Sequence, residues 1–321
     1  MAGVLLVAAT SCAPAFDCKK AATPSEKAIC ADPAALAADA AMSSAFSSLL
    51  ASAPAAQLGP IAAAQVKWLH ARDSECADSA AGTLGACLAR QSTQRLSFLL
   101  GQPEAGPGAA SRITPWFRFE KGGKGRAAID IELLKFPDPT DAAERAFNAA
   151  ADKLVGDLDQ PEKDDPSADR FDYERSMRLT YASPRFVSAH LDAYQDVGGA
   201  HPATFTGNVN VDFAAGREAR FDDLVDARGA EKIFSICMRS VAAQKKDKMG
   251  ADAPKSADDL AELVKNVKDA TRNLAAWSFG ADKATIGYDP YAVGSYAEGP
   301  YDCEIPYATL RDLAKPGFPL P

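Results

Sequence analysis

The stretch DVGGAHPATFTGNVNVDFAAGREARFDDLV, residues Asp196–Val225, decides the fold of the C-terminal part of this 321-residue chain. Gly198 and Gly199 lack a Cβ and therefore permit a sharp backbone turn into a strand. After Pro202 the apolar residues occupy odd positions and the polar residues even ones, and this period of two predicts a half-buried strand. The apolar positions are Phe205, Val209, Val211 and Phe213, and the polar positions are Thr206, Asn208, Asn210 and Asp212.

The stretch continues as a hairpin and then a helix. A turn over 214–216 is followed by Glu218–Phe221, which is predicted to return antiparallel, and the acidic pair Asp222 and Asp223 starts a helix. The flanking sequence predicts further strands at 116–119, 127–134, 173–181, 185–194, 277–288 and 302–306, and helices at 140–158, 229–248 and 256–274. Segregated strands and helices indicate an α+β domain with a mainly antiparallel sheet, which the last two strands close.

Two motifs in this region resemble a known family. They are GGAHP through FDDLV, and the closing stretch FGADKATIGYDPYAVGSYAEGPYDCEIPYATL, Phe279–Leu310. Together they resemble the C-terminal domain of the RsiV anti-sigma factors, which also accompanies the deacetylase domain of PdaC-type peptidoglycan enzymes. The resemblance spans roughly Arg112–Leu310. Because RsiV-type domains bind lysozyme, it implies recognition of another protein.

Four tyrosines lie close together near the end of the chain, between Tyr288 and Tyr301. Tyrosines on glycine-interrupted loops suit protein recognition, because they bury a large area at a small cost in conformational entropy. The alternative is that some of these rings pack on the sheet, since tyrosine also favours strands. The resemblance favours a contact loop beside the GGAHP turn. The predicted partner-binding residues are Gly198, Gly199, His201, Tyr291 and Tyr296.

The N-terminus indicates export. Met1–Ala15 has a short apolar core followed by Ala-Pro-Ala, which signal peptidase accepts, so we expect cleavage after Ala15. A competing interpretation is a lipobox with Cys12 acylated, which would make the protein a lipoprotein. No other apolar run is long enough to suggest a transmembrane segment in the mature chain. The predicted location is periplasmic or secreted.

Cysteine usage agrees with export. Six cysteines remain after removal of the signal peptide: Cys18, Cys30, Cys76, Cys87, Cys237 and Cys303. An even number in an oxidising compartment favours three disulfides. The first four can be connected in three ways. We favour the connectivity in which both disulfides close short loops, Cys18 with Cys30 and Cys76 with Cys87. Cys237 on a helix would then pair with Cys303 on the last strand. With no CxxC motif and three histidines, no zinc site and no cofactor are expected.

Residues 16–100 are predicted to form a small all-helical domain. Helices are expected at 24–30, from Pro33, from Pro60 and at 87–100. The second carries an apolar stripe of Leu36, Ala40, Met42, Phe46, Leu49 and Leu50. In the third, one face combines Gln65, Trp68, Leu69, Arg72, Asp73 and Cys76.

This pattern resembles the N-terminal domain of the lysozyme inhibitor LprI. The resemblance rests on the cysteine spacings together with Gln65-xx-Trp68-Leu69-xx-Arg72-Asp73-xx-Cys76. Phe46 and Ser92 depart from it, since a tyrosine and an aromatic residue are usual there. For the Trp68 face we favour a structural role over a contact surface, because helical stripes commonly face a core.

The predicted organisation is a signal peptide at 1–15, an LprI-like helical domain at 16–100, a Gly- and Pro-rich linker at 101–111 and an RsiV-like α+β domain at 112–321. The chain carries 43 acidic against 35 basic residues, a net charge of −8. Such a balance disfavours nucleic acid and anionic membranes and favours a cationic partner. Lysozymes are commonly basic.

A catalytic site is not expected. His201, with Asp196 and Asp212 nearby, could act as a general base, but no GxSxG elbow and no free cysteine supplies a nucleophile. The leading hypothesis is an exported envelope protein that binds lysozyme and inhibits it by covering its cleft. The alternatives are a peptidoglycan-binding module without inhibitory activity and a hydrolase centred on His201.

Overall fold

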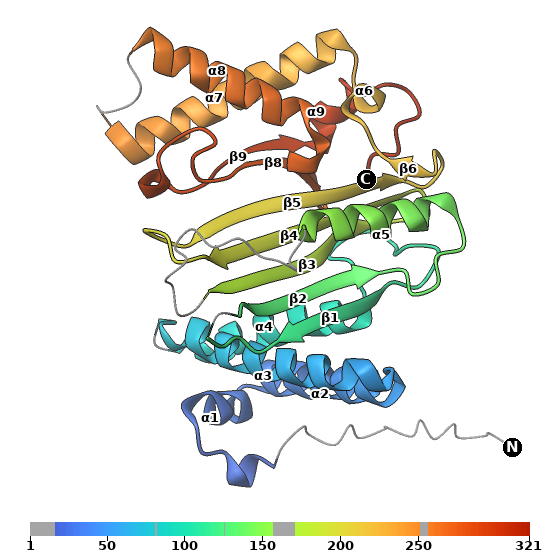
Figure 1. The fold of residues 1–321 in the computed structure, drawn as a ribbon, viewed down its shortest axis with the longest axis vertical. Coiled ribbons are helices and arrows are strands. Elements are labelled where there is room, and N and C mark those ends of the chain that lie inside the picture. The colour runs from blue at the N-terminus through green and yellow to red at the C-terminus, as the bar shows by residue number, and fades with distance from the viewer. Residues whose placement is uncertain (1–16, 81, 125, 157–170, 251–255) are drawn as a thin grey trace, which may run out of the picture. The chain divides into compact units, whose positions relative to one another are not determined.

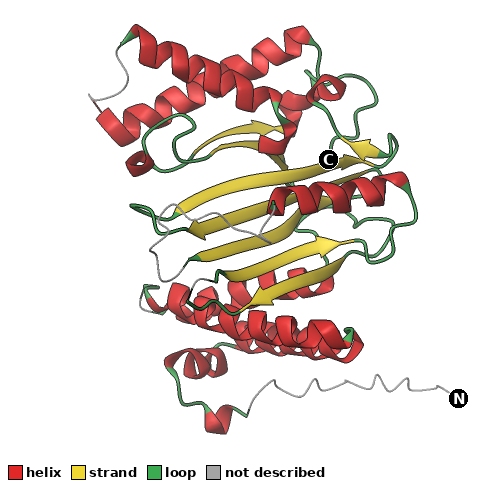
Figure 2. Cartoon of the chain, in the orientation of Figure 1, coloured by secondary structure: helices red, strands yellow, loops and turns green. Residues whose placement is uncertain are grey.

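The computed structural model describes residues 17–80, 82–124, 126–156, 171–250 and 256–321. The predicted signal peptide with Cys12, and most of the acidic stretch after residue 156, lie outside these residues. The chain divides into two compact units, Met1–Leu99 and Leu100–Pro321. The predicted fold class, a disulfide-linked helical region followed by an α+β region, is confirmed (Figure 2).

The first unit is helical because local capping and proline signals start its helices. It contains η1 (Cys18–Lys20), α1 (Pro24–Ala31), α2 (Pro33–Ser52), α3 (Ala55–Ala77) and α4 (Leu84–Leu100). Thr23 and Glu26 form a reciprocal capping box at the start of α1, and Asp32 caps α2. The disulfides Cys18–Cys30 and Cys76–Cys87 are present as predicted.

Two details of this unit differ from the prediction. The third helix begins at Ala55 rather than Pro60, because residues 55–58 are good helix formers and an internal proline near the N-terminus removes a single hydrogen bond. The predicted apolar stripe of α2 is only partly the buried face, since Met42 is buried and its other members are half-buried. The buried residues of α2 are Ala35, Asp39, Met42 and Ala45. Asp39 turns toward α3 because it pairs with Arg72 there.

α2 is also the one helix among the described residues whose length and apolar composition would let it cross a membrane. Those two properties do not identify a membrane span, because the core helix of a soluble domain shares them.

The second unit contains a six-stranded sheet in the order β1-β2-β3-β4-β5-β6 (Figure 1). Its strands are β1 (Thr114–Glu120), β2 (Ala128–Lys135), β3 (Asp172–Ala182), β4 (Phe186–Asp196), β5 (Ala203–Asp212) and β6 (Arg217–Glu218). Neighbours are antiparallel except β2 and β3, which pair in parallel. The connection between those two includes α5 (Ala142–Val155), which packs on one face of the sheet.

The last strands were predicted to close this sheet, and that prediction is wrong. β7 (Trp277–Phe279), β8 (Lys283–Tyr288) and β9 (Tyr301–Pro306) form a separate antiparallel sheet. It carries α7 (Ala227–Met249) and α8 (Ala257–Arg272), while α6 (Phe221–Leu224) and α9 (Tyr307–Arg311) are short (Figure 1). The Cys237–Cys303 disulfide joins α7 to β9. The buried residues of this layer include Trp277, Phe279 and Ile286.

Polar side chains join the two sheets, and they explain a second wrong expectation. Asn208 and Asn210 of β5 are buried, although the alternation predicted that they face solvent. Asn210 Nδ2 donates to the carbonyl oxygens of Leu274 and Trp277, both at 2.8 Å, and Asn208 Nδ2 donates to that of Ala275 at 3.0 Å. The far half of β5 is therefore covered on both faces.

Residues of the predicted linker hydrogen-bond to β3. The backbone N–H of Glu104 donates to the Leu179 carbonyl at 2.8 Å, and that of Gly108 donates to the Ala182 carbonyl at 3.0 Å. Gly106 has φ +91, and a Cβ there would lie 2.2 Å from the Ala182 carbonyl oxygen. Glycine is thus required at this close approach.

Candidate functional site

Three of the predicted partner-binding residues meet at the surface of the second unit. His201 stacks on Tyr296 with ring centroids 3.9 Å apart, and its Nε2 lies 2.9 Å from the Tyr291 hydroxyl. Tyr291 and Tyr296 have centroids 5.8 Å apart. We call His201, Tyr291 and Tyr296 the aromatic cluster. Ninety residues of sequence separate His201 from Tyr291, so folding alone creates this surface.

The four tyrosines of the closing stretch divide into two pairs. Tyr288 and Tyr301 are 1% and 3% exposed and pack in the core, whereas Tyr291 is 62% exposed and Tyr296 is half-buried. Tyr288 and Tyr301 lie at matching register positions of β8 and β9, so both rings are on the same face, and that face packs in the core. The two rings that remain at the surface belong to the loop between these strands.

The main role of the GGAHP turn is to position His201 through its backbone conformation. Gly198 has φ +84, a conformation that favours glycine, and its N–H donates to Asp196 Oδ1 at 3.2 Å. Gly199 is exposed and does not require that conformation. The turn delivers His201 to the start of β5, opposite the tyrosine loop.

The hydrogen bonds of His201 fix its tautomer. Nδ1 lies 2.9 Å from the Pro202 carbonyl oxygen, which can only accept, so the Nδ1–H donates. In a neutral imidazole, the Tyr291 hydroxyl then donates to Nε2. The expected acidic partners are engaged elsewhere: Asp196 accepts from Gly198 and Asp212 accepts from the N–H of Ala215. The ring therefore links the GGAHP turn to the tyrosine loop through its hydrogen bonds.

Tyr291 has φ +71, an uncommon conformation for a residue with a side chain. The surrounding loop must hold it there, and it is anchored at both ends. At one end Asp289 accepts from the Thr206 N–H at 3.0 Å and from its hydroxyl at 2.9 Å. In the middle, Asn266 of α8 donates to the Ala292 carbonyl at 2.8 Å. Asp289 thereby also covers part of the free edge of β5.

The other end of the loop is held by a buried ion pair. Lys245 Nζ lies 2.8 Å from Glu298 Oε2, with side chains 4% and 10% exposed. Glu298 also accepts from the Tyr301 hydroxyl at 2.5 Å and from the Ser295 N–H at 2.6 Å. Burial alone would raise the pKa of Glu298, but the hydrogen bonds from Lys245, Tyr301 and Ser295 outweigh it and lower the pKa to about 2. Burial, and then the bond to Glu298, raise the pKa of Tyr301.

Beside the aromatic cluster lies a cleft of about 390 Å³ between the open face of the large sheet and the tyrosine loop. Its lining residues are Glu174, Ser176, Asp192, Ala193, Tyr194, Thr204, Phe205, Thr206, Asp289, Pro290 and Pro300. Three carboxylates and no lysine or arginine are among them. Burial raises the pKa of Tyr194, and the charges of Asp196, Glu174 and Asp172 and the neighbouring Tyr296 raise it further. We call this the acidic cleft.

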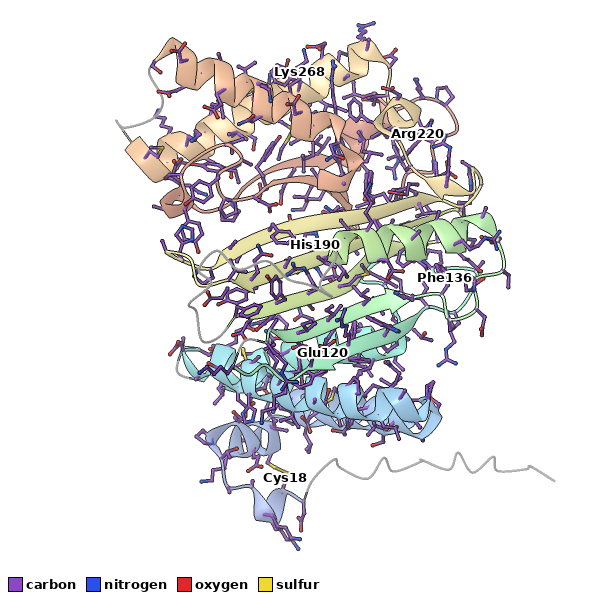
Figure 3. The ribbon with its side chains drawn as sticks, in the orientation of Figure 1. Cys18, Glu120, Phe136, His190, Arg220 and Lys268 are labelled. Atoms are coloured by element: carbon purple, nitrogen blue, oxygen red, sulfur yellow. A yellow bond between two sulfur atoms is a disulfide. The ribbon has the colours of Figure 1, made fainter. Side chains whose placement is uncertain are left out.

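The sequence did not single out the β4 residues that border this cleft. His190, Asp192 and Tyr194 alternate on one face of β4 (His190 is labelled in Figure 3). His190 Nδ1 lies 2.8 Å from Asn208 Oδ1, and its Nε2 lies 3.2 Å from Asp192 Oδ1. Arg178 Nη1 donates to Asp192 Oδ2 at 2.6 Å. The spacing of two residues between them was the one feature of the sequence that could have identified them, but the same spacing occurs on any strand with one face in solvent.

No group of three or more His, Cys, Asp or Glu within the described ranges is arranged to hold a metal ion.

In the helical unit, several side chains of the Gln65–Cys76 motif are buried in the interior. Arg72 is 5% exposed and pairs with Asp39 at 3.0 Å, and Arg95 donates to Gln65 Oε1 at 3.0 Å. Trp68 is half-buried, with the guanidinium carbons of Arg72 and Arg95 5.2 and 5.5 Å from its ring centroid. Burial raises the pKa of Asp39, and the Arg72 charge opposes that rise. Most of the motif is therefore structural.

Comparison with known proteins identifies two segments. Residues 18–99 match the family model "Lysozyme inhibitor LprI", and residues 222–308 match "Protein of unknown function (DUF3298)". The first match confirms the resemblance to LprI. The second covers much of the region that resembles RsiV. No curated protein matches the chain.

Solved structures of the DUF3298 family are similar to part of the chain. One is from Bacteroides fragilis NCTC 9343, with 14% identity over 64% of this chain and 94% of that one and a TM-score of 0.47. Another is from Pseudomonas aeruginosa PAO1, with 18% identity over 64% of this chain and 95% of that one and a TM-score of 0.41.

Proposed function

We propose that this protein binds a lysozyme in the cell envelope and inhibits it by covering its substrate cleft. The observation that carries the proposal is the match of residues 18–99 to the lysozyme-inhibitor LprI model. The three disulfides fit an oxidising compartment, periplasmic or extracellular, and the net charge of −8 suits a cationic partner. Inhibition of this kind is steric and electrostatic and needs no covalent step.

The proposed contact surface is the aromatic cluster together with the turn at Gly198 and Gly199. Two observations support it. Tyr291 presents a large apolar ring at the surface, and the Asp289 and Glu298 anchors hold its loop in place before any partner arrives. A surface that is ordered in advance loses little conformational entropy on binding, which favours affinity. Tyrosines are enriched among the residues that dominate binding energy.

Binding and inhibition are tested with the mature chain, starting at Phe16, against a cationic lysozyme. Calorimetry at low and high salt measures affinity, and lysis of cell walls measures inhibition. We expect binding that weakens with salt, and protection of the walls. Absence of both affinity and protection would remove the proposal. Retention of the protein on purified sacculi without lysozyme would instead favour the peptidoglycan-binding alternative.

The contact surface is tested by Tyr291→Ala and His201→Ala, with Val264→Ala on α8 as a matched control. Val264 is 41% exposed and lies on a helix outside the cluster. We expect the two cluster variants to weaken lysozyme binding about tenfold or more, as truncation of a dominant contact does. The control should bind like the wild type. Equal affinity of all four proteins would exclude this surface.

The hydrolase alternative centred on His201 makes an opposite prediction. If the protein turned over a cell-wall substrate, His201→Ala would abolish that turnover. Because Nδ1 and Nε2 both already make hydrogen bonds within the protein, His201 is not expected to act on a substrate. We therefore expect any measured rate to be unchanged in the variant.

A further inference from the structure

We propose that a groove along the first half of α7 binds an extended acidic peptide segment of a partner protein. The groove has a volume of about 600 Å³, and Thr309, Asp312 and Leu313 line it opposite α7. Because its cations would repel a cationic lysozyme, this inference goes beyond the proposed function and concerns a second partner. Three observations carry it: the arrangement of the cations, their lack of counter-ions, and the preformed shape of the groove.

Three cations of α7 form a single row along the groove. Arg228, Lys232 and Arg239 all line it, and all three are exposed. At 3.6 residues per turn, their spacings of four and seven positions place them within about 40° of one another around the helix axis. A rise of about 1.5 Å per residue makes the row about 16 Å long. We call these three residues the basic row.

The basic row is not neutralised within the part of the chain that the structure describes. None of its three side chains makes a hydrogen bond or an ion pair there. Two carboxylates line the groove. One of them, Glu231, pairs with Arg272 at 3.2 Å and with Lys268 at 3.6 Å, both outside the lining. The other, Asp312, is a single negative charge against three positive ones, so the groove keeps an excess of positive charge in a chain whose net charge is −8.

The basic row is unfavourable for the isolated helix. Arg228 lies in the first turn of α7, where the helix dipole disfavours a cation, and no acidic residue shares that turn. Arg228 and Lys232 are like charges four positions apart, which repel each other on a helix surface. Helix stability therefore does not explain these residues. An anion bound along the row would remove both unfavourable interactions.

The groove is formed before any partner arrives. The segment opposite α7 is fixed by a hydrogen bond from the Lys315 N–H to the Leu224 carbonyl at 2.7 Å. It lies close against the first turn of α7, since a Cβ at Gly229 would come within 3.0 Å of the Leu313 carbonyl oxygen. The half-buried side chains of Leu313 and Ile236 give the groove an apolar part. A preformed groove loses little conformational entropy on binding.

The shape of the groove favours a peptide over a small ion or a membrane. An extended peptide covers about 16 Å with about five residues, and its alternate side chains point to one side about 6.6 Å apart. Arg228 and Lys232 are separated by about 6 Å along the helix axis, so acidic residues at alternate positions match them. A guanidinium binds a carboxylate through two parallel hydrogen bonds. The net charge of −8 disfavours an anionic membrane surface.

The test uses the full mature chain and two capped pentapeptides, Glu-Val-Glu-Val-Glu and Gln-Val-Gln-Val-Gln, which differ in charge but hardly in shape. Binding is followed through the backbone amide NMR signals of Ser235 and Thr309, which line the groove. We expect the glutamate peptide to shift these signals and to bind about tenfold more tightly than the glutamine peptide, since bonds between charged groups are the stronger ones. Equal affinity of the two, or shifts confined to residues outside the groove, would overturn the proposal.

Two double variants locate the effect. Arg228→Gln/Arg239→Gln removes two charges from the groove, and Arg145→Gln/Lys153→Gln removes two from exposed positions of α5. We expect the first to weaken binding of the glutamate peptide at least fivefold and the second to change it less than twofold. Thermal unfolding of the first should occur at the wild-type temperature or above it, because the variant removes repulsion. Equal effects of both variants on peptide binding would mean that net charge alone acts, and would refute the proposal.

Two further probes separate a peptide from other anions. Acetate and inorganic phosphate should bind at least tenfold more weakly than the glutamate peptide, because each engages one part of the row. Binding of either ion as tight as that of the peptide would reduce the groove to a simple anion site. Vesicles that contain phosphatidylglycerol should not retain the protein. Retention that is lost in Arg228→Gln/Arg239→Gln would assign the groove to a lipid surface instead.

Discussion

Lys245 of α7 and Glu298 of the tyrosine loop form a buried ion pair at 2.8 Å, although 53 residues separate them. Lys248, one turn further along α7, donates to the Glu298 and Pro300 carbonyl oxygens at 2.9 and 2.6 Å. The end of α7 therefore holds the loop that presents Tyr291 and Tyr296. A surface far from the helix in sequence depends on a charge in its last two turns.

Removal of the lysine should be costly. In Lys245→Met the Glu298 carboxylate stays buried without its counter-ion, and we expect the free energy of unfolding to fall by about 3 kcal/mol. Urea denaturation measures it. Adding Glu298→Gln to this variant should restore part of the loss, because a neutral amide needs no counter-ion. A loss below about 1 kcal/mol would show that the pair does not anchor the loop.

The same pair predicts a pH dependence. The pKa of Glu298 is about 2 in the folded protein and lies below its ordinary value, so its contribution to stability is complete above that ordinary value and is lost as the pH falls through the folded pKa. Between pH 7 and pH 3 the wild type should lose about 2 kcal/mol more of unfolding free energy than Glu298→Gln. Urea titrations of both proteins at the two pH values test this. Parallel losses would contradict it.

Asn210 should contribute substantially to the stability of the protein, although it is polar. Its Nδ2 donates to the carbonyl groups of two buried residues, Leu274 just before the second sheet and Trp277 at its start, and its Oδ1 has no hydrogen-bond partner among the described residues. Asn210→Ala leaves both carbonyls unpaired and should lower the free energy of unfolding by about 2 kcal/mol. Thr204→Ala, at an exposed position of the same strand, should change it by less than about 0.5 kcal/mol. Similar values for the two variants would refute a joining role for Asn210.

The cysteines supply a test of location. After denaturation without reductant, no thiol of the mature protein recovered from cells should react, because all six cysteines are paired. The double variant Cys76→Ala/Cys87→Ala should unfold at lower denaturant concentration, with a loss of about 3 kcal/mol from the helical unit. Free thiols in the recovered protein would contradict placement in an oxidising compartment.

Much of the local structure could be predicted because it is governed by neighbours in sequence. The capping box at Thr23 and the short loops closed by Cys18–Cys30 and Cys76–Cys87 each involve residues fewer than 13 positions apart. The strand alternation from Phe205 onward was visible for the same reason. For the candidate site, the sequence identified the aromatic residues and the glycine turn, but it did not predict which of these residues contact one another.

The tertiary structure alone decided which polar residues are buried and which tyrosines are exposed. A period of two shows that a strand has two different faces, but not that a second sheet covers part of the polar one, as it does at Asn208 and Asn210. Likewise Tyr288 and Tyr301 share the face of β8 and β9 that packs in the core, while Tyr291 is held outward by contacts to His201 and the loop anchors. The physical reason is common to both: burial depends on what packs from elsewhere in the chain, such as Leu274, 64 residues from Asn210, and Tyr291, 90 residues from His201.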